Sequence, residues 1–141
     1  MADLKAMVQS MYDGISTASD VGAMLDEHVT EDFVEHEEMP GMPAASGRDQ
    51  AEQQISMLQR AFSDLRFNVE DMIQEGTKVV ARATVTGTHT GEFIGIPASG
   101  NKVDFKVIDI FDFRNDKISA HWGVTDSGAM MMQIGAMEPP G

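Results

Sequence analysis

Residues 103–113 read Val-Asp-Phe-Lys-Val-Ile-Asp-Ile-Phe-Asp-Phe, and this stretch decides the fold that we expect. The odd-numbered positions are all apolar except Asp109. Side chains alternate between the two faces of a β-strand, so this pattern predicts a strand with one face toward the core. That inner face would carry a single carboxylate among apolar side chains.

The second half of the chain repeats the strand pattern. The runs 65–73, 79–89 and 118–126 also alternate, and the polar turns 75–78 and 115–116 separate them from their neighbours. Successive strands joined by short turns pair in antiparallel fashion, and residues 90–102 form a longer loop rich in glycine and proline. We therefore expect an antiparallel meander.

The first half has helical spacing instead. Apolar side chains recur at steps of three and four within residues 4–15, 19–28 and 48–62, and a short helix is expected at 127–134. Helices followed by a meander predict an α+β fold in which three N-terminal helices cover a curved, cone-shaped antiparallel sheet. Three helices cannot fill such a cone, so we expect a pocket between helices and sheet.

Composition narrows the function. The chain has 141 residues, enough for one domain spanning 1–141, and no cysteine, which excludes thiol chemistry and disulfides. Its formal charge of −13 disfavours nucleic acid and anionic membranes as partners.

Targeting and cofactor motifs are missing from the sequence. The first ten residues have no apolar core typical of a signal peptide, and no apolar run is long enough to span a membrane, so we expect a cytoplasmic protein. Glycine-rich phosphate loops, G-x-S-x-G and H-E-x-x-H do not occur either. Proton transfer without a cofactor remains as the expected chemistry.

Asp109 is the first candidate for that chemistry. A carboxylate directed into an apolar hollow has its pKa raised unless a donor pairs with it, and carboxylates in such places serve as general acids or bases. The structural alternative is that the even-numbered face is equally relevant and that Asp109 only pairs with a neighbouring Arg or His.

Asp126 and His121 are the second pair of candidates. Asp126 lies on the same, mostly apolar face of the expected strand as Ile118 and Trp122. His121, at an odd-numbered position, lies on the opposite face. Asp126 also precedes the last helix, where Asp is a common N-cap. His121 can join Asp126 only if a β-bulge resets the alternation.

Three histidines, His36, His89 and His121, fall at strand ends. A neutral imidazole there could accept a proton near pH 7 or polarise a carbonyl group. None of them has the H-x-H or H-x-x-x-H spacing that places two ligands on one face, so we expect no metal site. A lone histidine is more often a packed or surface residue.

Several segments together resemble one enzyme family. They are Phe33-Val34-Glu35-His36 with Gly47, residues 61–65 leading into 69–71, Thr86 to Pro97, and Lys117-Ile118 to His121-Trp122 with Asp126. Over nearly the whole chain the sequence is similar to the SnoaL-like polyketide cyclases and ester cyclases of the nuclear transport factor 2-like superfamily.

This resemblance implies a cone-shaped α+β barrel, usually a homodimer through the sheet, that closes a polyketide ring by an aldol step without a cofactor. By this resemblance Asp126 is the late-strand acid, with His121 before it and Asp109 on the penultimate strand. The substrate would be a small apolar carbonyl compound. Its expected contacts are Tyr12, Phe33, His36, His89, Trp122 and Met131. Alternatives are a ketosteroid-type isomerase, a dehydratase, or a non-catalytic binding or dimerisation module.

Overall fold

A computed structural model describes residues 3–37 and 47–136 and confirms the α+β fold. The described helices and strands follow the order α1 (Leu4–Thr17), α2 (Val21–His28), β1 (Val29–Glu35), α3 (Arg48–Ala61), β2 (Phe62–Glu75), β3 (Lys78–His89), β4 (Lys102–Arg114), β5 (Lys117–Thr125) and α4 (Ser127–Gln133). Every helix and strand predicted from the pattern is present. Among the described residues, no helix is both long and apolar enough to cross a membrane.

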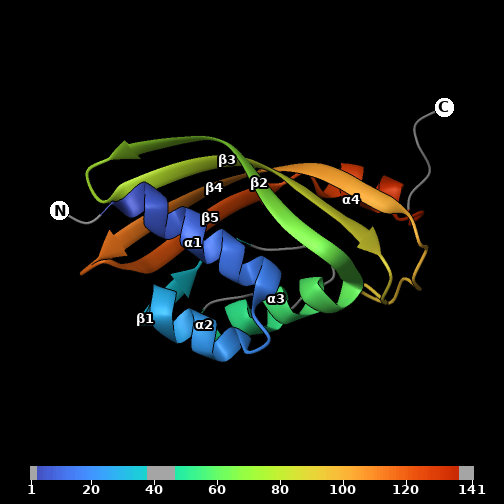
Figure 1. Cartoon of the computed structure of the whole chain (residues 1–141), viewed down its shortest axis with the longest axis horizontal. Helices are drawn as coiled ribbons and strands as arrows, with labels where there is room; N and C mark the ends of the chain where they lie inside the picture. The colour runs from blue at the N-terminus through green and yellow to red at the C-terminus, as the bar shows by residue number, and fades with distance from the viewer. Residues whose placement is uncertain (1–2, 38–46, 137–141) are drawn as a thin grey trace.

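The helices begin where the sequence supplies caps. Asp3 accepts a hydrogen bond from the Ala6 backbone N–H at 3.1 Å, and Asp20 accepts one from Ala23 at 3.0 Å. The buried side of α1 is the stripe predicted from its spacing, with Val8, Met11, Tyr12 and Ile15. These caps and stripes fix α1 and α2 against the sheet, on the same side as α3 (Figure 1).

The sheet is mixed and open, which corrects the expectation of a purely antiparallel barrel. Its strand order is β1-β5-β4-β3-β2, and β1 pairs with β5 in parallel. The chain enters β1 directly from α2 and then leaves through α3 to the opposite edge, so β1 and β2 become edge strands. Helix α3 packs against both of these edges.

A β-bulge in β5 changes which side chains point inward. Phe113 pairs with Ile118 but Asp112 pairs with Ala120, so Ser119 is an extra residue. The bulge resets the alternation, and Trp122 then faces outward, contrary to the expected parity. His121 instead joins the inner face.

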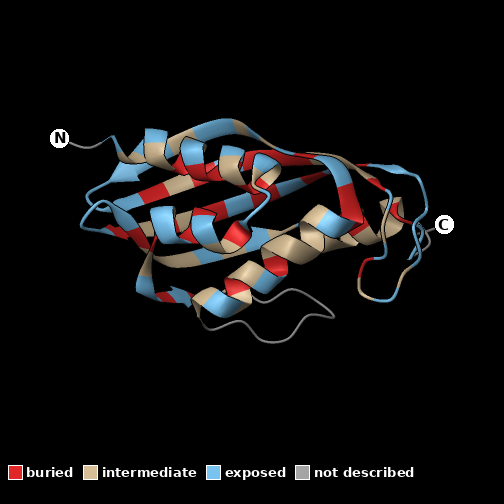
Figure 2. Cartoon of the chain, turned by 60° about the horizontal axis from the view of Figure 1, so that its bottom comes forward, coloured by how far each residue is buried: buried red, intermediate tan, exposed pale blue. Residues whose placement is uncertain are grey.

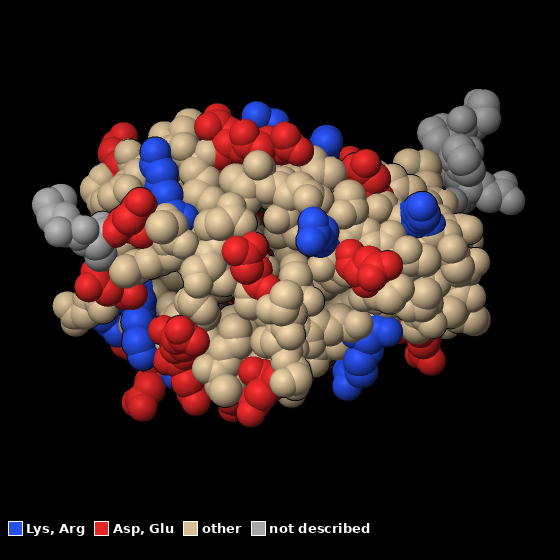
Figure 3. Space-filling model, viewed as in Figure 1, with Lys and Arg blue, Asp and Glu red and all other residues tan. Residues whose placement is uncertain are grey.

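Buried apolar side chains lie between the helices and the inner face of the sheet (Figure 2). Acidic side chains are spread over the surface seen in Figure 3, in keeping with the charge of −13. A carboxylate inside the molecule is therefore the exception that needs an explanation.

Candidate active site

A cavity of about 110 Å³ lies between α1, α3 and the inner face of the sheet. Most of its wall is apolar, as expected, and includes Phe33, Leu58, Val107 and Phe111. The polar lining residues are few: Tyr12, Glu35, Glu37, Gln54, Asp109, His121 and Thr125. An apolar hollow with a few convergent polar groups is the usual form of a small-molecule site.

Asp109 projects into this cavity from β4 and is 6% exposed. The Tyr12 hydroxyl donates a hydrogen bond to its Oδ2 at 2.5 Å, and His121 Nε2 lies 2.8 Å from its Oδ1. Burial, followed by the charge of Asp109 and this hydrogen bond, raises the pKa of Tyr12 strongly. Tyr12 therefore stays protonated and remains a donor to Asp109.

His121 lies between two carboxylates. Its Nδ1 is 2.6 Å from Glu35 Oε1, and its Nε2 contacts Asp109. Burial alone would lower the pKa of His121, but the hydrogen bonds and charges of Asp109 and Glu35 outweigh it and raise that pKa to about 10. Since both nitrogens face acceptors, both carry protons, and the ring is an imidazolium at neutral pH.

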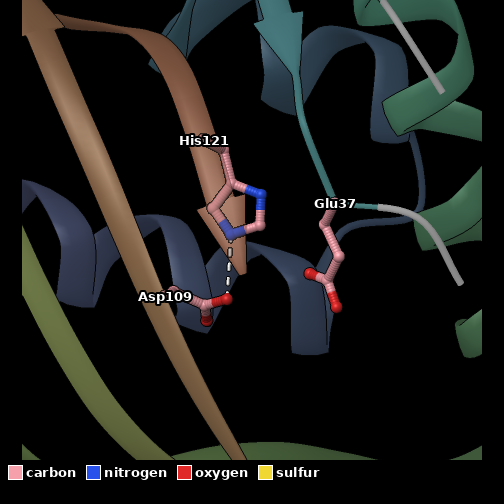
Figure 4. A group of neighbouring side chains, drawn as sticks. All are labelled: Glu37, Asp109 and His121. Carbon is pink, nitrogen blue, oxygen red and sulfur yellow. Dashed lines mark hydrogen bonds and ion pairs between the residues drawn. The ribbon is translucent and has the colours of Figure 1, made fainter. Parts of the chain in front are cut away.

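Glu37 follows β1 and points toward Asp109 and His121 (Figure 4). Thr125 donates a hydrogen bond to Glu37 Oε2 at 2.7 Å, while the Glu37 backbone N–H donates to Glu35 Oε1 at 2.9 Å. Burial raises the pKa of Glu37, although Thr125 and the charge of His121 act in the opposite direction. Asp109 thus has two side-chain donors, Tyr12 and His121, whereas Glu37 has one, Thr125.

Gly123 makes room for this convergence. It pairs with Asp109 across β4 and β5, and a Cβ atom at this position would lie 2.6 Å from Asp109 Oδ1 and closer still to Glu37 Oε1. Glycine inside a strand often marks such a close approach. Any larger side chain would push one of the two carboxylates away.

The same groups could also be considered as metal ligands. Carboxylate oxygens of Glu37 and Asp109 and a ring nitrogen of His121 lie within 4.8 Å of one another. Both ring nitrogens of His121 already face carboxylate oxygens, Glu35 Oε1 at Nδ1 and Asp109 Oδ1 at Nε2, so a metal on this ring would have to replace one of these hydrogen bonds. As built, the cluster is better suited to holding protons than a cation.

Comparisons with known proteins identify the family of this chain. The sequence profile of the SnoaL-like polyketide cyclases matches residues 6–134. This chain belongs to that family. A comparison with curated protein sequences gave no match.

Solved structures support the family fold. AclR from Streptomyces galilaeus, described as a candidate hydroxylase, has a TM-score of 0.85 at 25% identity, covering 100% of this chain and 86% of that one. A protein from Jannaschia sp., described as a candidate SnoaL-like polyketide cyclase, has a TM-score of 0.81 at 27% identity, covering 97% of this chain and 93% of that one. TsrD from Streptomyces laurentii has a TM-score of 0.77 at 28% identity, covering 97% and 100%.

In this SnoaL-like chain, Asp126 does not reach the cavity. It is exposed and accepts a hydrogen bond from the Ala129 backbone N–H at 3.0 Å, so it caps α4. The cap expected from the sequence is confirmed, and the expected place beside His121 is wrong. The bulge that turns His121 inward leaves Asp126 outside.

Four expected contact residues of the SnoaL-like chain, His36, His89, Trp122 and Met131, also lie outside the cavity. His36 is exposed and stacks on Trp122, with ring centroids 4.6 Å apart, because the bulge turns Trp122 to the outer face. His89 is fully buried at the far end of β3, beside Ser99. Met131 packs against the core from α4 without lining the cavity. Tyr12 and Phe33 do line it, as expected.

The sequence reasoning overlooked Glu35 and Glu37. Both share parity with Phe33, an inward position of the extended run, so alternation alone could have placed them inside. His36 lies on the opposite, exposed face of the same run. The parallel pairing of Glu35 with His121 then joins the two segments.

Proposed function

We propose that this chain is a cofactor-independent enzyme that performs acid/base chemistry of the aldol type on a small apolar carbonyl substrate. The observation that carries the proposal is the convergence of Glu37, Asp109 and His121 within 4.8 Å in a mostly apolar cavity. Poor hydration there makes proton exchange with a carbon acid practicable. Family membership supports the same class of chemistry.

Asp109 is the proposed base. Tyr12 and His121 each donate a hydrogen bond to one of its oxygens, which orients the carboxylate. A carboxylate oxygen has two lone pairs, so each can still accept a proton from the substrate. Asp109 would remove a proton from the carbon next to a carbonyl group and leave an enolate.

Glu37 is the proposed acid, because burial raises its pKa and favours its protonated form. When the enolate carbon attacks a second carbonyl carbon, a C–C bond forms and the attacked oxygen becomes an alkoxide. Glu37 would give its proton to that alkoxide. A proton passing from Asp109 to Glu37 would then restore both groups. Holding both carbons in reacting geometry can supply about 7–11 kcal/mol of the barrier.

The first experiment tests proton abstraction without assuming the product. Ketones with two separated carbonyl groups, such as 2,6-heptanedione, are incubated with the protein in D₂O, and loss of the α-proton signal is followed by NMR. We expect exchange that depends on the protein and falls sharply in Asp109→Asn. If no ketone in a broad panel exchanges faster with the protein than without it, the acid/base proposal is wrong and a binding module is favoured.

A second panel separates the reactions that share this step. Linear polyketide esters report ring closure, unsaturated ketones report double-bond migration, and β-hydroxy ketones report dehydration. We expect ring closure to be the fastest. Faster migration or dehydration would favour the isomerase or dehydratase alternative.

We also propose that the chain forms a homodimer through the outer face of the sheet. Apolar side chains are exposed on that face: Val34 at 41%, Ile108 at 49%, Trp122 at 37% and Val124 at 76%. Ile108 and Val124 are direct cross-strand neighbours. A contiguous apolar patch of this kind is typical of an interface. Sedimentation should give a dimer for the wild type and a monomer for Val124→Lys.

A further inference from the structure

One polar side chain on the helical wall of the cavity has no protein partner. Gln54 belongs to the inward side of α3, between Ala51 and Leu58, and is 9% exposed. Within residues 3–37 and 47–136, its Nε2 is a buried donor with no hydrogen-bond acceptor. Gln54 lines the same cavity as Glu35, Glu37, Asp109 and His121, which together form the acid cluster. A ligand in the cavity could supply the missing acceptor.

A buried amide without a hydrogen-bond partner lowers the free energy of unfolding. A buried N–H without an acceptor loses its hydrogen bonds to water and gains none in return. Nearby positions on this side of α3 are apolar, with Ile55 and Leu58 also lining the cavity. A glutamine within this apolar stripe therefore costs stability when the cavity is empty, and a ligand acceptor would remove that cost.

The charges in the cavity define the kind of acceptor. Three acidic side chains, Glu35, Glu37 and Asp109, line it against one cation, His121, so an anionic ligand group finds no excess of positive charge there. An amide N–H pairs well with a neutral carbonyl oxygen. Asp109 and His121 come from the central strands β4 and β5, and Glu35 and Glu37 lie at the end of β1, whereas Gln54 reaches the cavity from α3.

We propose that Gln54 Nε2 donates a hydrogen bond to a carbonyl oxygen of the bound substrate, on the α3 wall and apart from the carbonyl activated at Asp109. This inference rests on the proposed function. It specifies the substrate class as a compound with at least two carbonyl groups on an otherwise apolar skeleton. Gln54 is thus a substrate-binding residue that sets which way the ligand lies.

The test uses Gln54→Met, which keeps the length of the side chain but removes the amide, and Gln53→Met as a matched control on the exposed side of α3. In the ligand-free protein, Gln54→Met should raise the melting temperature by roughly 2–4 °C, because it removes an unpartnered buried donor. Gln53→Met should leave it nearly unchanged. An unchanged or lower melting temperature in Gln54→Met would show that the amide is already satisfied, against the proposal.

Ligand binding is measured with 1-tetralone and tetralin, which differ by one carbonyl group. Wild type and Gln53→Met should bind tetralone about five- to tenfold more tightly than tetralin, and Gln54→Met should lose most of that preference. Asp109→Asn should keep it. No preference in the wild type, or a preference that survives in Gln54→Met and disappears in Asp109→Asn, would overturn the assignment to Gln54.

The two proposals can fail separately. If Gln54→Met loses the preference for tetralone but the wild type exchanges no α-protons, the carbonyl contact holds and the acid/base proposal falls. If the wild type exchanges protons and Gln54→Met keeps the preference for tetralone over tetralin, only the inference on Gln54 is wrong.

Discussion

Two buried histidines of this molecule occupy opposite kinds of surroundings. His121 lies in the cavity between Asp109 and Glu35, and its pKa is raised to about 10. His89 lies at the end of β3, where Phe62 packs against its ring at a centroid distance of 5.5 Å, and burial lowers its pKa. Both histidines look equivalent in the sequence, since each follows an alternating strand pattern.

Their hydrogen-bond partners account for the difference. The Ser99 backbone N–H donates to His89 Nδ1 at 3.2 Å, so this nitrogen keeps its lone pair and the ring is neutral. The Gly100 backbone N–H also bonds to the His89 carbonyl, and His89 thereby fixes the loop after β3. A donor partner thus makes His89 structural, whereas two carboxylates make His121 part of a charged site.

The largest expected effect comes from removing the carboxylate beside His121. Asp109→Asn should lower kcat/KM by about 10²-fold or more in the reaction identified by the substrate panel, because it removes the proposed base. Asp126→Asn should change kcat/KM little, since Asp126 is exposed and asparagine also caps helices. Equal, small losses in both variants would contradict the assignment.

The next largest effect contrasts one glycine from each region. Gly123→Ala should lower kcat/KM by about tenfold to 100-fold, because its Cβ would displace Asp109 or Glu37 from reacting geometry. Gly91→Ala should instead cost about 1–3 kcal/mol of unfolding free energy with kcat/KM retained, since its Cβ would collide with the backbone carbonyl of Arg60. Kinetics and urea unfolding of both variants measure this contrast. A loss of kcat/KM in Gly91→Ala together with unchanged kcat/KM in Gly123→Ala would contradict this prediction.

A third prediction concerns alkaline pH. The pKa of His121 is raised from 6.5 unfolded to about 10 folded, so its contribution to stability is complete below 6.5 and is lost as pH rises through about 10. We expect the His121 ring signals in NMR spectra to stay constant from pH 6 to 8 and to shift only near pH 10. Asp109→Asn should bring that transition to lower pH. A wild-type transition near 6.5 would refute the imidazolium.

The smallest effect is expected at acid pH and comes from His89. Its folded pKa lies below 6.5, so its contribution is present above 6.5 and is lost as pH falls through the lowered folded value. His89→Asn should therefore flatten the loss of melting temperature between pH 6.5 and 5 relative to the wild type. An unchanged slope would show that His89 is not held neutral.

The alternation of residues 103–113 was enough to predict β4 and to single out Asp109 as the inward carboxylate. The N-cap role of Asp126 could likewise be predicted from its position directly before a helix. The hydrogen-bond partners of Asp109 could not be predicted from the local sequence pattern. Tyr12 is separated from it by 97 positions, and only the packing of α1 on the sheet brings the two together.

Local periodicity and helix capping are enough to predict the helices, the strands and the single acid on the inner face of β4. The bulge at Ser119, the inward position of His121 and its contact with Glu35, 86 positions away, emerge only when the sheet is assembled. Strand register and parallel pairing depend on how distant segments close the sheet, and no local pattern encodes that closure. The acid cluster is a product of that closure.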